Sequence, residues 1–202
     1  MKDQSALWDR LRQGDEKALG IIYNDYFEVL INYGLRLSPH HEVVEDSVQD
    51  LFVDIWNLRA NLSPTDSIKN YLICSFRRKL FKKLKQKINT TDDGVLETEI
   101  SEDQHFLSQM IESEEFNDRA QKLGKVMESL SHRQREAIFL KYNEGMDYEA
   151  ICEAMDLKYQ SVRNLISTAI IRIRENLPIK ILLLVIIEYI YKGYSLSHYG
   201  VL

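Results

Sequence analysis

Residues 131–177 read SHRQREAIFLKYNEGMDYEAICEAMDLKYQSVRNLISTAIIRIRENL and predict three consecutive helices separated by two short breaks. Ser131 and Gln134 have the spacing of a capping box at the start of the first helix, and Gly145 is placed to end it. Asp147 suits the N-cap of a short second helix. A tight turn then leads into a longer third helix. This order of elements predicts a helix-turn-helix unit.

The third helix of this stretch is amphipathic. Its apolar side chains step by four, three and four residues and form one stripe: Val162, Ile166, Ala169 and Ile173. The opposite side carries hydrogen-bond donors, and residues 157–174 include no acidic residue. An acid-free helix after a tight turn suits a recognition helix in a DNA major groove. A plain three-helix packing unit with a solvated basic face is the alternative, because helix-turn-helix geometry is not unique to DNA readers.

The composition of the 202-residue chain fits a mainly helical protein with one large or two small domains. Cys74 and Cys152 lie far apart without metal-ligand spacing, so neither a metal site nor a disulfide framework is expected, and a reducing cytoplasm fits. The polar N-terminal residues contain no secretory signal. A net charge of −5 argues against a generic nucleic-acid coating protein.

Charge is unevenly distributed along the chain. Residues 67–91 contain eight basic residues and no acidic residue, whereas residues 92–118 contain ten acidic residues and no Lys or Arg. Such a boundary, which opens with the sequence NTTDDG, is typical of a linker rather than of a continuing core. The chain is therefore predicted to be all-α, with two small helical domains joined by an acidic linker.

The first domain is predicted to begin with a helix that Asp15 caps and that ends at the SPHH sequence of residues 38–41. The next helix, at about 42–59, is expected to bury five apolar residues: Val44, Val48, Leu51, Ile55 and Leu58. Its other face carries what we call the polar strip: Asp46, Gln49, Asp50 and Val53. From these residues alone, simple solvation of the strip is the preferred interpretation. Paired carboxylates also suggest metal or acid-base chemistry, but no third ligand stands at a helical step from them.

A loop at 61–66 precedes a third helix that Asp66 or Ser67 can cap. Its buried stripe repeats every four residues: Ile68, Leu72, Phe76, Leu80 and Leu84. The remaining surface combines lysines and arginines with Tyr71 and Phe81. Single-stranded nucleic acid requires this combination, because cations follow its backbone and rings stack on its bases. Exposure for solubility is the alternative, but uncompensated positive charges repel one another, which favours a polyanionic partner.

Together the two halves resemble the extracytoplasmic-function sigma factors of bacterial RNA polymerase. The resemblance covers about residues 19–87 and 123–177. The segments IIYNDYFEVLINYGLRL, VVEDSVQDLFVDIW and SIKNYLICSFRRKLFKKLKQ are similar, in this order, to region two of the family. The segment LSHRQREAIFLKYNEGMDYEAICEAMDLKYQSVRNLISTAIIRIREN is similar to region four. Neither motif is specific by itself, but both together, with an acidic linker between them, identify the chain as a member of this family.

The resemblance implies roles for individual residues. The polar strip would dock on the clamp helices of the largest polymerase subunit, in place of the solvated interpretation. The loop at 61–67, with Lys69 and Asn70, would capture and read the unpaired non-template strand of the minus-10 element, while Arg77 and Arg78 hold its phosphates. The residues implied at the minus-35 element are Gln160, Ser161, Arg163, Asn164, Ser167 and Thr168, with Arg172 and Arg174 as backbone contacts.

The resemblance also implies a domain plan: a region-two domain at 1–88, an acidic linker at 89–120, a region-four domain at 121–177 and a hydrophobic tail at 178–202. The function it implies is binding rather than catalysis. Core RNA polymerase, promoter DNA and an anti-sigma factor are the expected partners, and no cofactor, metal or small-molecule substrate is expected. The linker would either mimic nucleic acid in the polymerase channel or serve as a solubilising spacer. A stand-alone helix-turn-helix transcriptional regulator is the alternative function.

Three positions depart from the family pattern. Asp156 stands where many members have a turn glycine, and Cys152 stands where a small alanine is usual. Asp tolerates the left-handed conformation and Cys is a small hydrophobe, so neither removes the fold. Ile171 replaces a more usual Lys or Arg, which reduces phosphate contact or marks a protein interface.

The tail contains an apolar segment, residues 179–191, interrupted only by Lys180 and Glu188. As a helix it would span about 20 Å, against about 30 Å for the hydrocarbon core of a membrane, so it is not expected to cross a bilayer. Three interpretations are open: docking on one of the domains, a dimer or anti-sigma contact, or peripheral membrane association. Burial against protein is the preferred one.

Overall fold

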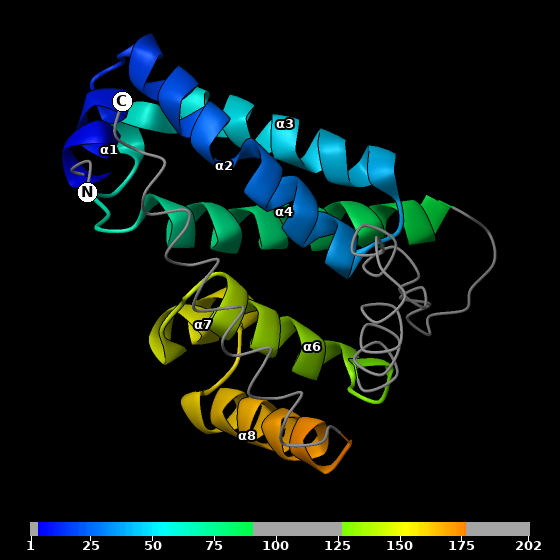
Figure 1. Ribbon diagram of the computed structural model, residues 1–202. Coiled ribbons are helices and arrows are strands. Elements are labelled where there is room, and N and C mark those ends of the chain that lie inside the picture. The colour runs from blue at the N-terminus through cyan, green and yellow to red at the C-terminus, as the bar shows by residue number, and fades with distance from the viewer. Residues whose placement is uncertain (1–3, 91–126, 177–202) are drawn as a thin grey trace, which may run out of the picture. The chain divides into compact units, whose positions relative to one another are not determined.

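The computed structural model describes residues 4–90 and 127–176, so most of the predicted linker and the whole predicted tail lie outside the described residues (Figure 1). The chain divides into two compact units, one formed by residues 1–101 and 140–162 and the other by residues 102–139 and 163–202. Every regular element in the described ranges is a helix, as predicted. None of the helices in those ranges is long and apolar enough to span a membrane.

Four α-helices make up most of the first unit: α1 (Gln4–Arg12), α2 (Glu16–Leu37), α3 (His41–Leu58) and α4 (Ile68–Thr90). A short 3-10 turn, η1 (Arg59–Asn61), continues α3. Helices α2, α3 and α4 pack alongside one another, while α1 lies against α2, η1 and the start of α4 (Figure 1).

The sequence patterns predict three of these four helices and the caps of two of them, α2 and α4. Oδ1 of Asp15 accepts hydrogen bonds from the backbone N–H groups at the start of α2. Oγ of Ser67 accepts a hydrogen bond from the backbone N–H of Asn70 at the start of α4. The patterns miss α1, because only Trp8 and Leu11 of its nine residues are buried. Two buried residues are too few to form a repeating stripe.

The core of the first unit contains the predicted apolar stripes. On α4, four of the five predicted residues are fully buried and Leu84 is half-buried. On α3, four of the five are buried, but the prediction for Leu58 is wrong. Its side chain is 52% exposed, because α3 ends at this residue and the chain turns into η1.

Gly34 allows α2 to approach α3 and α4 closely. A Cβ atom at this position would lie 2.5 Å from Cγ1 of Val44 and 2.7 Å from Cζ of Phe76. Both of those side chains are fully buried, so neither can move into solvent to relieve the overlap. The close packing of the three helices therefore requires glycine at this position.

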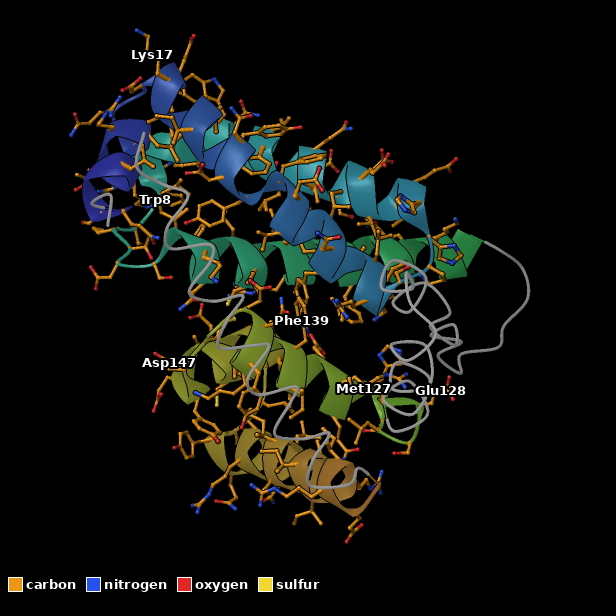
Figure 2. All side chains as sticks on the ribbon, in the orientation of Figure 1. Trp8, Lys17, Met127, Glu128, Phe139 and Asp147 are labelled. Atoms are coloured by element: carbon orange, nitrogen blue, oxygen red, sulfur yellow. The ribbon has the colours of Figure 1, made fainter. Side chains whose placement is uncertain are left out.

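The other described helices are α6 (His132–Ile138), the π-helical segment η2 (Phe139–Asn143), α7 (Tyr148–Met155) and α8 (Tyr159–Asn176). The capping box of Ser131 and Gln134 is present, with both reciprocal hydrogen bonds. Gly145 has a φ of +66°, as a helix stop requires. Asp147, labelled in Figure 2, caps α7 by accepting a hydrogen bond from the N–H of Ala150 at 2.7 Å.

The turn between α7 and α8 passes through a left-handed residue. Asp156 has φ 53° and ψ 53°, the conformation that glycine adopts most easily. The N–H of the next residue, Leu157, donates to the carbonyl of Cys152 at 3.1 Å and closes the end of α7. Asp156 thus takes the conformation expected for the usual turn glycine.

Gly34→Ala is expected to destabilise the protein by about 1–3 kcal/mol, the usual cost of forcing extra atoms into a packed core. Gly20 is a matched control, because it lies in the same helix, is exposed, and has nothing within 4 Å of an added Cβ. Gly20→Ala is expected to stabilise the protein by about 0.5–1 kcal/mol through helix propensity. Urea unfolding followed by circular dichroism measures both changes. Equal effects of the two substitutions would contradict the close approach of α2.

Candidate nucleic-acid interface

Helix α8 exposes the polar face that the sequence predicted. Val162, Ile166 and Ala169 are fully buried and Ile173 is half-buried, so the apolar stripe points inward. The residues implied in DNA binding are all exposed: Gln160, Ser161, Arg163, Asn164, Ser167, Thr168, Arg172 and Arg174. No carboxylate lies among them, so the face suits the base edges and phosphates of a major groove.

Arg172, on this face, bonds two residues outside α8 but within its own unit. Its Nη1 donates to the carbonyl of Ser129 at 3.1 Å and to Oε1 of Gln134 at 3.3 Å. Gln134 belongs to the capping box of α6, so Arg172 ties α8 to the start of α6. This structural role competes with the phosphate contact that the resemblance implies for Arg172.

The first turn of α4 carries Lys69 and Asn70, and both are half-buried. Nζ of Lys69 donates to the main-chain oxygen of Glu144 at 2.7 Å. Further along α4, Arg78 is exposed and pairs with Glu153 at 3.2 Å. Both acidic residues belong to the same compact unit as α4. Residues 69, 70 and 78 therefore lie along one helix, but Lys69 and Arg78 already have anionic or carbonyl partners.

Arg77, which is half-buried, and Phe81, which is exposed, form a cation and ring pair on α4. The guanidinium carbon of Arg77 lies 4.6 Å from the ring centroid of Phe81, and Phe81 is 37% exposed. Tyr71, the other ring noted in the sequence, is instead half-buried, with its ring centroid 4.8 Å from that of Trp8. Of the two rings, Phe81 is the one whose surface a nucleic-acid base can reach.

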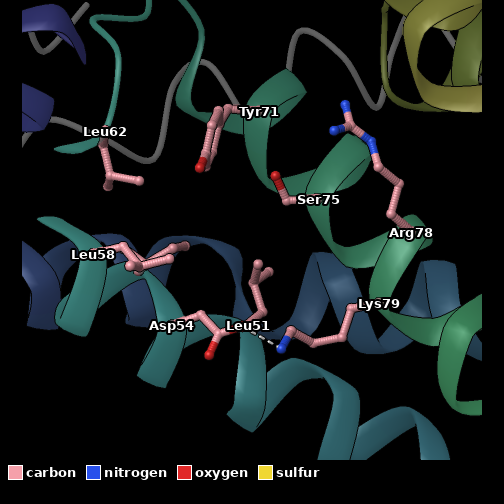
Figure 3. A pocket seen from close by; sticks show the side chains of 9 residues that line it. Leu51, Asp54, Leu58, Leu62, Tyr71, Ser75, Arg78 and Lys79 are labelled. Carbon is pink, nitrogen blue, oxygen red and sulfur yellow. Dashed lines mark hydrogen bonds and ion pairs between the residues drawn. The ribbon is translucent and has the colours of Figure 1, made fainter.

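A cavity of about 210 Å³ opens between α3, α4 and the loop at 61–67 (Figure 3). Its apolar side chains are Leu51, Ile55, Leu58, Leu62 and Tyr71, and its polar ones are Asp54, Ser75, Arg78 and Lys79. A ligand with apolar faces, polar edges and an attached anion matches this lining. An unstacked nucleotide has that character. Leu58, which sequence reasoning placed in the core, is part of this lining.

The loop beside the cavity is held by α1. Nε1 of Trp8 donates to the carbonyl of Ser63 at 2.9 Å, and Nε of Arg12 donates to the carbonyl of Leu62 at 2.7 Å. Trp8, labelled in Figure 2, is fully buried. Sequence reasoning missed these two residues. The one feature that points to them is a large aromatic residue in an otherwise polar N-terminal segment.

All four residues of the polar strip are exposed on α3. Asp50 nevertheless has a partner, because its Oδ2 lies 2.7 Å from Nζ of Lys83 on α4. This hydrogen bond lowers the pKa of Asp50 below its ordinary value of 3.8. Asp54, beside the strip, forms a similar ion pair with Lys79. The strip thus presents acidic and amide groups to solvent, with one carboxylate already paired.

The described residues offer little for metal or thiol chemistry. In residues 4–90 and 127–176, no group of three His, Cys, Asp or Glu side chains is arranged to hold a metal ion. Both cysteines are free thiols. Burial raises the pKa of Cys74 to about 11, so its thiolate is scarce at neutral pH. Burial also raises the pKa of Cys152.

Comparison with known proteins identifies similar sequences. The family model described as Sigma-70, region 4 matches residues 120–173. The RNA polymerase sigma factor YlaC of Bacillus subtilis (strain 168) is 21% identical over 162 residues, which span 77% of this chain and 90% of YlaC.

Two solved structures have a similar fold. CnrH, solved in complex with the cytosolic domain of CnrY, matches with a TM-score of 0.56 and 16% identity over 85% of this chain and 95% of that chain. The sigma factor RpoE, solved in complex with the anti-sigma factor NepR from Bartonella quintana, matches with a TM-score of 0.53 and 21% identity over 80% and 94%, respectively. These likenesses establish the fold.

Lys83→Met is expected to raise the pKa of Asp50 toward 3.8, because it removes the hydrogen bond that favours the carboxylate. The lowered pKa contributes stability above pH 3.8, and this contribution is lost as the pH falls through the lower folded-state value. The stability difference between wild type and Lys83→Met should therefore shrink as the pH falls below 3.8. NMR titration of the Asp50 side chain measures the shift, and an unchanged pKa would contradict the ion pair.

Proposed function

Because the chain is an extracytoplasmic-function sigma factor, which directs transcription initiation, we propose that it recognises the minus-10 and minus-35 elements of a promoter while bound to core RNA polymerase. One observation carries the proposal. The segment that matches sigma region four contains α8 up to residue 173, and the residues of α8 implied in DNA recognition are exposed on one acid-free face. A surface of this kind reads base edges in the major groove.

Region two of the proposed protein comprises residues 1–88, and its polar strip docks on the clamp helices of the largest polymerase subunit. The exposure of Asp46, Gln49, Asp50 and Val53 on α3 supports this role. Docking replaces the hydration of these groups, and in the case of Asp50 it competes with Lys83.

The loop at 61–67 and the cavity beside it capture an unpaired base of the minus-10 element. The cavity volume and its mixed lining support this assignment, and Arg78 at the cavity supplies a cation for the attached phosphate when the phosphate replaces its exposed partner Glu153. Arg77 and Phe81 extend the surface along α4, where a ring and a guanidinium can stack on a neighbouring base. Lys69 and Asn70 complete it at the start of the helix. Capture of bases offsets the unstacking cost of a few kcal/mol per step.

The remaining assignments follow from the sequence. Residues 89–120 form an acidic linker, residues 121–177 form the region-four domain, and residues 178–202 form a hydrophobic tail. The protein acts in the cytoplasm, by binding rather than by catalysis, without a cofactor or small-molecule substrate. An anti-sigma factor is its proposed regulator. The solved complex of RpoE with an anti-sigma factor supports this partner class.

Asp46→Arg is expected to weaken binding to core RNA polymerase at least about tenfold, because it reverses charge within the polar strip. Glu45→Arg is the matched control. It makes the same change of charge at the neighbouring exposed residue, which points about 100° away around α3. The measurement is the affinity of fluorescently labelled chain for core polymerase, with helicity checked by circular dichroism.

Equal binding of the two variants would contradict the docking role of the strip. Absence of binding by the wild type would favour a stand-alone helix-turn-helix regulator. Asp46 is preferred to Asp50 for this test, because a substitution at Asp50 also breaks the ion pair with Lys83.

Arg163→Ala and Arg174→Ala are expected to affect minus-35 binding in different ways. Arg163, near the start of α8, should contact a base, so its loss relaxes preference at one base pair by about 1–3 kcal/mol. Arg174 should contact a phosphate, so its loss weakens all sequences alike and reduces the salt dependence by about 0.9 in log–log slope. Selection from a randomised duplex library with the wild-type holoenzyme supplies the motif, and fluorescence anisotropy measures the variants. A uniform loss in both variants would contradict the base contact.

A further inference from the structure

Helix α1 contacts the backbone at the two ends of the loop at 61–67. Three of its side chains bond the backbone at or next to the loop: Arg12 to the carbonyl of Leu62 at 2.7 Å, Trp8 to the carbonyl of Ser63 at 2.9 Å, and Gln4 to the N–H of Ile68 at 3.3 Å. The other hydrogen bonds of the loop described here are local, such as that from the N–H of Ser67 to Oγ1 of Thr65. Helix α1 therefore supplies the loop's long-range anchors among the described residues.

The same helix also supports two side chains that line the cavity. The ring of Trp8 packs on Tyr71, and the guanidinium of Arg12 bonds the backbone of Leu62. Both Tyr71 and Leu62 line the cavity. Trp8 is fully buried, so neighbouring side chains hold its ring in place. A shift of this ring would remove the N–H donor from the carbonyl of Ser63. The position of α1 thus determines the position of one side of the cavity.

Arg12 is itself held in place before it reaches the loop. Its Nη1 donates to Oδ1 of Asp9, one turn earlier in α1, at 2.8 Å, which leaves Nε directed at the carbonyl of Leu62. A charged donor forms a stronger hydrogen bond than a neutral one. Arg10, on the same helix, does not contact the loop and instead bonds Asp15 at the cap of α2. The two arginines of α1 therefore bond different segments: Arg12 bonds the loop, and Arg10 bonds the cap of α2.

We propose that Trp8 and Arg12 are positioning residues for promoter melting, which hold the loop and the cavity wall in the geometry that accepts an unpaired base. The proposal rests on the proposed role of this loop in capturing the minus-10 strand. A loop that samples many conformations must be ordered when it binds a base, which weakens capture and discrimination. Anchors that hold the loop beforehand remove that cost. Neither residue needs to touch the DNA.

The first test compares Arg12→Met with Arg10→Met, because both remove a guanidinium from α1 and keep an unbranched side chain. Hydrogen-deuterium exchange of peptides covering residues 62–70 is expected to be faster in Arg12→Met and unchanged in Arg10→Met. This readout requires neither DNA nor polymerase. Wild-type exchange rates in Arg12→Met would overturn the proposed anchoring.

The second test measures base discrimination by the holoenzyme. The probes are a single-stranded oligonucleotide that carries the minus-10 sequence selected by the wild type and versions with one base changed. Arg12→Met is expected to reduce the preference for the selected sequence roughly three- to tenfold, while Arg10→Met stays within about twofold of wild type. Binding to core polymerase and to duplex minus-35 DNA should be the same in both variants. A merely structural defect would instead weaken every binding step together.

Trp8→Phe provides a second variant, because it keeps a buried aromatic ring near Tyr71 while it removes the N–H donor to Ser63 together with part of the buried ring volume. It is expected to show the same faster exchange and reduced discrimination as Arg12→Met. If the wild type discriminates between minus-10 sequences and both Arg12→Met and Trp8→Phe discriminate equally well, the positioning role is overturned. The proposed function of the loop would then be unaffected. A wild-type holoenzyme that does not discriminate would overturn the proposed function of the loop itself.

Discussion

The apolar stripe of α4 is the constraint on which the first unit depends. Apolar side chains at every fourth position allow only one face of α4 to enter the core, and burial of an unpaired Lys or Arg costs several kcal/mol. The lysines and arginines of α4 therefore point toward solvent or lie at the edges of the core. Gly34 completes this arrangement, because it lets α2 approach Phe76 of the stripe closely enough to exclude solvent. The same packing places Arg78 and Lys79 beside the cavity and Phe81 at the surface.

Several charged groups of the proposed interfaces have partners within the chain. Asp50 pairs with Lys83, and their side chains are 51% and 27% exposed. Ion pairs as exposed as this one contribute about 0–1 kcal/mol, so a polymerase or nucleic-acid group can replace one partner at little cost. The ion pair with Lys83 orients the Asp50 carboxylate, which can still exchange Lys83 for another cationic partner. Arg172 differs, because its partners include Gln134 of the α6 capping box, and releasing it would leave that box less supported.

The predictions made from sequence succeed where a residue acts through its immediate neighbours. The caps at Asp15, Ser131 and Asp147, the stop at Gly145 and the left-handed turn at Asp156 depend on bonds within a few residues, and each is present. The stripes of α3, α4 and α8 also follow from spacing, since periodicity alone decides which side chains share a helix face. Leu58 is the exception, because periodicity does not say where the helix leaves the core.

By itself, the sequence determined the helices other than α1, the caps at Asp15, Ser131 and Asp147, the acid-free face of α8 and the separation of basic from acidic segments, because these properties are local or additive along the chain. Only the tertiary structure decided that α1 anchors the loop at 61–67, that Asp50 pairs with Lys83 and that Leu58 lines a cavity. Trp8 and Ser63 are 55 residues apart, and no short-range spacing predicts a hydrogen bond between them. Such contacts exist only because the apolar stripes bring distant segments together, and the packing of whole helices then decides which polar groups meet.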